Sequence, residues 1–202
     1  MTKSEPEPTT TLLLIRHGET DWDRQGRYDG HTDLRLNAAG RAQAIAVASG
    51  LTSPRCHAIV SSPLARAWET AQVIAEKTRV RRLSVDNELI EREYGEVEGL
   101  TITDRLLRWP DGEWPGLEEL IDVQDRALTA LMEIASTYQG KRIAVVTHNG
   151  VINAVLTYLS GGTHGIGKTT LYSGGITTIL HDADGLRIES VNQTLHMPGI
   201  PT

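Results

Sequence analysis

Two histidines occupy the same local setting at distant points of the chain. His17 follows the apolar segment 11–15 and one arginine, and His148 follows the apolar segment 142–147; a glycine comes shortly after each. Such runs are typical of buried strands. Open α/β sheets bind ligands at the carboxyl ends of their strands, so neighbouring strands would place both imidazoles in one crevice. Imidazole can serve there as a nucleophile or a general acid–base, although a lone histidine at a strand end is often only structural.

Two arginines could supply the charge that binds an anion. Arg16 directly precedes His17, and Arg66 falls in the first turn of a helix predicted to begin at Ser62 with Pro63 at its first position. A cation at this end of a helix opposes the helix dipole. A bound phosphate would offset that cost, because helix N-termini and guanidinium groups both bind phosphate. The alternative for Arg66 is a solvated surface residue.

The elements that must position these residues alternate between strands and helices. This alternation predicts an α/β fold with a mostly parallel sheet, formed by a single domain over 11–202 after a disordered polar tail at 1–10. Segments 18–36 and 86–115 are predicted to be loop-rich. Predicted strands are 11–15, 57–60, 80–85, 142–147, 176–180 and 186–191, and predicted helices are 38–50 (capped by Asn37), 62–75, 117–138 and 151–159.

Composition excludes several classes of protein. The chain has 202 residues, a formal net charge of -6 and one cysteine, Cys56, which cannot form an internal disulfide or a multi-cysteine metal site. The remaining histidines show no paired ligand spacing, so we predict no metal and no cofactor. The acidic balance argues against nucleic acid and membrane surfaces as partners. No apolar segment approaches the roughly 20 residues of a membrane span, and residues 1–10 lack the apolar stretch of a signal peptide, which favours a cytoplasmic protein.

Four blocks of sequence carry a more specific signal. They are LLLIRHGETDWDRQGRYDGHTDLRLNAAGRAQA at 12–44, SSPLARAWETAQ at 61–72, ELIEREYGEVEG at 88–99 and VVTHNGVINAVL at 145–156. Together they resemble the histidine phosphatase superfamily, also called the phosphoglycerate mutase-like family. The resemblance covers about residues 11–195 in the family's order. It implies a three-layer α/β/α sandwich, phosphoryl chemistry on a small phosphorylated substrate, and often a homodimer.

The resemblance also implies roles for the matching residues. His17 would be the nucleophile that becomes phosphohistidine, while Arg16, Arg66 and His148 would hold the phosphoryl oxygens. Glu91 would protonate the leaving alkoxide and later deprotonate the attacking water; otherwise it is one of several solvated acids in its block. Imidazole attacks only when the attacking nitrogen is unprotonated, so the other ring nitrogen should donate to a fixed acceptor such as a backbone carbonyl. Burial and a bound phosphate should raise the pKa of Glu91.

Four further residues are candidates for substrate binding: Gly18, Thr20, Asp23 and Asn149. Asp23 stands where the family usually has asparagine. A carboxylate near phosphate is unfavourable, so the donor role is expected to pass to the Thr20 hydroxyl and the backbone N–H of Gly18.

Three other functions compete with a phosphomonoester hydrolase. Mutases of the family carry a longer, basic insertion between the acid and the second histidine. Here Glu91 and His148 are 57 positions apart, and segment 92–147 holds six basic and eleven acidic residues, which favours hydrolysis. A catalytically inactive phosphate-binding module is a second alternative. Residues 162–169 match the P-loop pattern G-x4-G-K-[ST], but a predicted helix precedes them and two glycines follow at 174–175, so a surface loop is expected.

Overall fold

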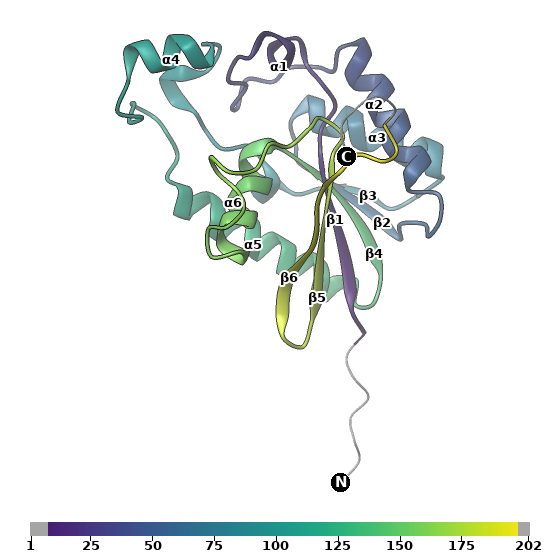
Figure 1. Cartoon of the computed structure of the whole chain (residues 1–202). Helices are drawn as coiled ribbons and strands as arrows, with labels where there is room; N and C mark the ends of the chain where they lie inside the picture. Colours follow the sequence, from purple (N-terminus) through teal and green to yellow (C-terminus); the bar gives the residue numbers. More distant parts are fainter. Residues whose placement is uncertain (1–7, 198–202) are drawn as a thin grey trace.

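The computed structural model describes residues 8–197, and its strands form one mixed sheet (Figure 1). The strand order is β3-β2-β4-β1-β5-β6. The first four strands of this order run parallel, and β5 and β6 add an antiparallel hairpin at one edge. The strands are β1 (Thr10–Arg16), β2 (Ala58–Ser61), β3 (Leu83–Val85), β4 (Arg142–Thr147), β5 (Ile176–Asp182) and β6 (Gly185–Gln193).

Helices cover both faces of this sheet, as the three-layer prediction requires. Successive side chains of a strand point to opposite faces. Leu13 and Ile15 of β1 accordingly join a core with α2 (Ala38–Gly50) and α3 (Ala65–Thr78). Leu12 and Leu14 face the second core, which includes α5 (Leu120–Thr137) and α6 (Asn149–Leu159). The central residues 12–15 of β1 are therefore all apolar, because both faces of this part of the strand are covered.

The two histidine-bearing strands are neighbours, as predicted. β1 and β4 pair in parallel with Ile15 opposite Val146 and Arg16 opposite Thr147. The ladder continues one step further, because the backbone N–H of His17 donates to the carbonyl of Thr147 at 3.0 Å. Equal register therefore places His17 and His148 at the same edge of the sheet.

Both segments predicted to be loop-rich contain short helices. Segment 18–36 contains α1 (Asp21–Gln25), and segment 86–115 contains α4 (Ile102–Arg108) and the 3-10 turns η1 (Asn87–Leu89) and η2 (Gly95–Val97). α1 and α4 each begin with a capping box, Thr20 with Asp23 and Thr101 with Asp104. Aspartate replaces the Glu or Gln of the usual motif, which is why the pattern escapes a search for the standard form.

Several predicted boundaries were wrong. Helix α3 begins at Ala65 after Leu64, so Ser62 does not cap it and Pro63 is not its first residue. β3 begins only at Leu83, because Arg79 ends α3 in the left-handed region at φ 58°. Thr10 opens β1 and is buried, so the predicted tail of residues 1–10 is too long at its C-terminal end; residues 1–7 of that tail lie outside the described residues.

The remaining predicted elements agree with the structure to within a few residues. Asn37 caps α2, and its side chain accepts from the N–H of Gly40. The P-loop-like segment 162–169 is a series of turns after α6, with Lys168 Nζ donating to the carbonyl of Gly162, and no helix follows it in the described chain. Among the helices within residues 8–197, none is long and apolar enough to cross a membrane.

Candidate active site

His17 lies at the end of β1 in the tautomer that a nucleophile needs. Its side chain is buried, and Nδ1 is 2.8 Å from the carbonyl oxygen of Gly18, which can only accept. Nδ1 therefore carries the proton, and Nε2 keeps its lone pair. Burial, followed by the charge of Arg66, lowers the pKa of His17 to about 3, so the ring is neutral at physiological pH. The expected backbone acceptor is thus confirmed.

Arg66 is fully buried beside this nitrogen. Its Nε donates to Nε2 of His17 at 3.2 Å, and its two terminal nitrogens donate to the carbonyls of Thr32 (2.9 Å) and Gly30 (2.7 Å). The helix that carries it begins only one residue earlier. The alternative of a solvated surface arginine is therefore wrong: this cation is fixed against the imidazole by two carbonyls of the loop after α1.

Arg16 and Asp23 form an ion pair at the pocket wall. Arg16 Nη2 contacts the Asp23 carboxylate, and Nη1 donates to the carbonyl of Leu171 at 2.6 Å. Asp23 also accepts from the N–H and the hydroxyl of Thr20, both at 2.9 Å. Burial opposes ionisation of Asp23, but Arg16 and the bonds from Thr20 contribute to a lowered pKa. The carboxylate is thus ionised and held in place.

His148 is the N-cap of α6 and lies next to His17. Its ring centroid is 5.1 Å from that of His17, with 59° between the planes. Nε2 is 2.6 Å from the hydroxyl oxygen of Ser62, while Nδ1 has no hydrogen-bond partner among the described residues. Burial and then the charge of Arg66 lower the pKa of His148 well below its usual value, so this ring is neutral as well.

Glu91 is a buried acid and not one of the solvated carboxylates of its block. Its oxygens accept from the N–H groups of Arg92 (2.7 Å) and Gly150 (3.1 Å). Burial raises its pKa, although these two bonds oppose the shift. Arg126 of α5 fixes the backbone that carries it by donating to the carbonyls of Ile90 (2.7 Å) and Glu91 (3.1 Å). A carboxyl group with a raised pKa is therefore held at a fixed point of the site.

These side chains surround a pocket of about 240 Å³. Its walls include five of the predicted residues and several that the sequence did not single out. The lining consists of Arg16, His17, Asp23, Gly26, Arg27, Tyr28, Asp29, Glu91, Tyr94, Ile102 and Asn149. Arg66 and His148 are fully buried and contact or flank His17 without lining this pocket.

The two donors expected in place of Asp23 are already used. The N–H of Gly18 donates to the hydroxyl of Thr70 at 3.0 Å, and the fully buried Thr20 hydroxyl donates to Asp23. Neither Gly18 nor Thr20 lines the pocket. Their expected role as phosphate donors stays a prediction; in this arrangement both groups are part of the scaffold that positions α1 and His17.

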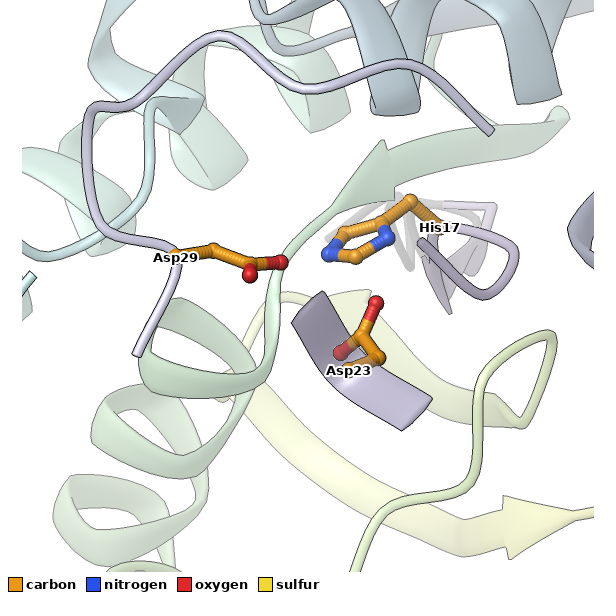
Figure 2. A group of neighbouring side chains, drawn as sticks. All are labelled: His17, Asp23 and Asp29. Carbon is orange, nitrogen blue, oxygen red and sulfur yellow. The ribbon is translucent and has the colours of Figure 1, made fainter. Parts of the chain in front are cut away.

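Asp29 is the main residue that the sequence analysis missed. Its residue is 9% exposed, its Oδ2 lies 3.7 Å from Nε of Arg66, and its Oδ1 has no hydrogen-bond partner among the described residues. Burial, followed by repulsion from Asp23, raises the pKa of Asp29 to about 7. Figure 2 shows its carboxyl group pointing toward the His17 ring. Its position six residues after Asp23 gave no signal of this role.

Aromatic side chains form one wall of the pocket. Tyr28 and Tyr94 have ring centroids 5.1 Å apart, and Trp114 lies 6.2 Å from Tyr28. Trp114 Nε1 donates to the carbonyl of Tyr94 at 2.7 Å. The segment around α4 thus contributes an apolar surface beside the polar centre.

Comparison with known proteins agrees with this geometry. The family model described as "Histidine phosphatase superfamily (branch 1)" matches residues 12–194. The chain belongs to this superfamily. It is 35% identical over 190 residues to "Uncharacterized phosphatase PhoE" of Bacillus subtilis, covering 94% of this chain and 98% of the relative. It is 36% identical over 159 residues to "Metal-independent phosphoserine phosphatase" of Arabidopsis thaliana, covering 72% and 67%.

Solved structures of the superfamily share the architecture. "Bacillus stearothermophilus YhfR" superposes with a TM-score of 0.84 at 27% identity, covering 93% of this chain and 98% of that one. The phosphoglycerate mutase-like sandwich predicted from the four sequence blocks is therefore confirmed, and so is the family itself.

Proposed function

We propose that this chain hydrolyses the phosphomonoester of a small metabolite through a phosphohistidine on Nε2 of His17, without a metal or cofactor. The observation that carries the proposal is the tautomer of His17. Nδ1 is held as a donor by Gly18, so Nε2 is the unprotonated nitrogen, and Glu91, whose pKa is raised by burial, lines the same pocket. The relatives named as phosphatases, one of them as metal-independent, support this assignment.

The first half of the reaction forms the phosphoenzyme. The lone pair of Nε2 attacks phosphorus, the ester P–O bond breaks, and the proton of Glu91 passes to the departing alkoxide. Arg66 already donates toward Nε2 and would stabilise the charge that develops on the phosphoryl oxygens, together with Arg16. Burial raises the pKa of Glu91, which favours its role as the proton donor.

The second half returns the enzyme to its starting state. A water molecule attacks phosphorus, its proton passes to the carboxylate of Glu91, the P–N bond breaks, and inorganic phosphate leaves. Each residue thereby ends with the proton it began with. His148, which lies beside His17, would contact the phosphoryl group with its polar ring.

Hydrolysis is favoured over the mutase reaction, in which a substrate hydroxyl accepts the phosphoryl group in place of water. The pocket has about 240 Å³ and carries the carboxyl groups of Asp23, Asp29 and Glu91 in its wall. The ionised carboxylate of Asp23, joined by that of Asp29 above about pH 7, disfavours a substrate with a second phosphate. The acidic surplus of segment 92–147 has the same effect.

The test combines two leaving groups with two variants. Wild type should hydrolyse p-nitrophenyl phosphate in the presence of EDTA, and His17→Ala should be inactive. Glu91→Gln should lose far more activity on an alkyl phosphate such as phosphoserine than on p-nitrophenyl phosphate, because the aryl oxide leaves without a proton. Equal rates for wild type and His17→Ala would overturn the proposal. Isomerisation of 3-phosphoglycerate with catalytic 2,3-bisphosphoglycerate would instead establish the mutase.

A further inference from the structure

Three side chains with metal-binding atoms meet in the phosphate pocket. One ligand-type atom from each of His17, Asp23 and Asp29 lies within 4.8 Å of the other two. Figure 2 shows the two carboxyl groups on different sides of the imidazole ring. Within residues 8–197 no other group of three His, Cys, Asp or Glu side chains comes together in this way. The spacing of the histidines along the sequence gave no hint of it, because two of the three groups are carboxylates.

The carboxyl group of Asp29 is the independent sign of a missing partner. Its side chain is nine-tenths buried, lines the pocket and points at the His17 ring. Oδ1 is buried without a hydrogen-bond partner in the described chain. A buried carboxylate oxygen without a partner is costly, and a cation in the pocket would remove that cost.

The other two groups are supported in the way that metal ligands usually are. A metal-binding histidine commonly donates its second ring N–H to a carbonyl, and ligating carboxylates are themselves hydrogen-bonded. Nδ1 of His17 donates to Gly18, which leaves Nε2 as the ligand atom once the ion displaces the N–H of Arg66 that donates to it at 3.2 Å. Asp23 accepts twice from Thr20. The ligand groups are therefore oriented in the absence of the ion.

The charge of the pocket allows a cation to enter. Arg16 and Arg66 carry two positive charges, but Asp23 pairs with the first and Asp29 lies 3.7 Å from the second. The family's usual asparagine at position 23 would leave one of these charges uncompensated. A mixed set of one imidazole nitrogen and two carboxylate oxygens suits Zn²⁺ better than Mg²⁺ or Ca²⁺, which prefer oxygen ligands alone.

We propose that this pocket binds one divalent transition-metal ion, Zn²⁺ by its ligand chemistry, through Nε2 of His17 and one oxygen each of Asp23 and Asp29. Tetrahedral zinc with ligand distances of about 2.1 Å places its ligands roughly 3.4 Å apart, so the group contracts on binding. Asp29 supplies that movement because its Oδ1 is not tied to another residue. Water completes the coordination on the pocket side.

The ion and the phosphoryl group exclude each other, because both need the lone pair of Nε2. Zn²⁺ is therefore an inhibitor competitive with substrate, and a chelator restores activity. This inhibitory consequence rests on the proposed function, whereas binding of the ion does not. The same three residues thus make the phosphatase sensitive to free zinc.

The test measures binding without turnover. Chelator-treated protein is titrated with Zn²⁺ by calorimetry and with Co²⁺ by visible absorption, which reports the coordination geometry. The variants are Asp29→Asn, Asp23→Asn and His17→Ala, with Asp184→Asn in the β5–β6 turn as a matched control far from the pocket (Figure 1). Melting curves establish that each variant is folded.

We expect wild type and Asp184→Asn to bind one equivalent with equal affinity and Asp29→Asn and Asp23→Asn to bind at least tenfold more weakly, which is about 1.4 kcal/mol. His17→Ala should lose the Co²⁺ absorption band. Wild-type affinity in the Asp29 and His17 variants would overturn the proposal, because it would place the ion at another histidine. An enzyme inactive on every phosphomonoester would refute the proposed function and leave these binding constants unchanged.

Discussion

Asp29→Asn should improve the enzyme above neutral pH and leave it almost unchanged below. Asp29 has a pKa raised to about 7 by burial and by Asp23, so its proton is bound below this pH and lost above it. The carboxyl group is about 10% ionised at pH 6 and about 90% ionised at pH 8. Asparagine resembles the protonated acid in shape and charge, so the substitution matters only where the wild-type group is ionised.

The magnitude follows from the distance between Asp29 and the His17 ring. One ring nitrogen of His17 and a carboxylate oxygen of Asp29 lie within 4.8 Å of each other, and the phosphoryl group is proposed to bind at this ring. Two unit charges at this separation repel by about 3.5 kcal/mol at an effective dielectric constant of about 20. Arg66, at 3.7 Å from Asp29, compensates much of this. A residual of about 1 kcal/mol corresponds to a roughly fivefold higher kcat/KM for the variant at pH 8.

The assay is kcat/KM on p-nitrophenyl phosphate from pH 5 to 9 with EDTA present, which removes any inhibitory metal. The ratio of variant to wild type is the quantity of interest, because titration of the substrate phosphate cancels in it. We expect a ratio near 1 at pH 6 that rises to about 5 at pH 8, and a flat ratio near 1 for Asp184→Asn. A ratio for Asp29→Asn that is the same at both pH values would refute the reasoning.

Two other substitutions and one further measurement on Asp29→Asn test the scaffold. Arg126→Ala should lower kcat about tenfold on an alkyl phosphate and less on p-nitrophenyl phosphate, with KM little changed, because Arg126 acts by holding the backbone of Glu91; an equal loss on both substrates would contradict this. Gly150→Ala should have the same substrate-dependent effect in a folded protein, since its Cβ would lie 2.5 Å from Oε1 of Glu91. Asp29→Asn should raise the melting temperature at pH 8 and not at pH 4: the folded pKa of Asp29 lies above the unfolded value, so its contribution to stability is present below about pH 4 and lost as the pH rises through about 7.

The fold was largely predictable because β1 and β4 are buried on both faces. Such strands read as continuous apolar runs, and the histidine and glycine after each run mark the edge of the sheet where ligands bind. The tautomer of His17 was predictable for a chemical reason, since a nucleophilic imidazole needs its other nitrogen protonated. The boundaries of α3 were less predictable, because Ser62 has the composition of a cap but its hydroxyl bonds His148 and the N–H of Leu64.

The parts of the site that the sequence analysis missed depend on contacts between distant loops. Asp29 reads as an ordinary loop acid, and only the packing of the loop after α1 against Arg66 buries it. Thr20 and Gly18 carry suitable donors, but the capping of α1 and the hydroxyl of Thr70 use them within the protein. Residue type indicates what a group can do, whereas its partners in the fold decide whether it is still available.

The backbone of His17 extends the central ladder of the sheet. The N–H of His17 donates to Thr147 in the pairing of β1 with β4, which are flanked on both sides by further strands. Deuterium can replace this amide hydrogen only when this pairing opens, and the flanking strands oppose that opening. The slowest-exchanging amides should therefore include that of His17, and heat inactivation should coincide with loss of the whole sheet.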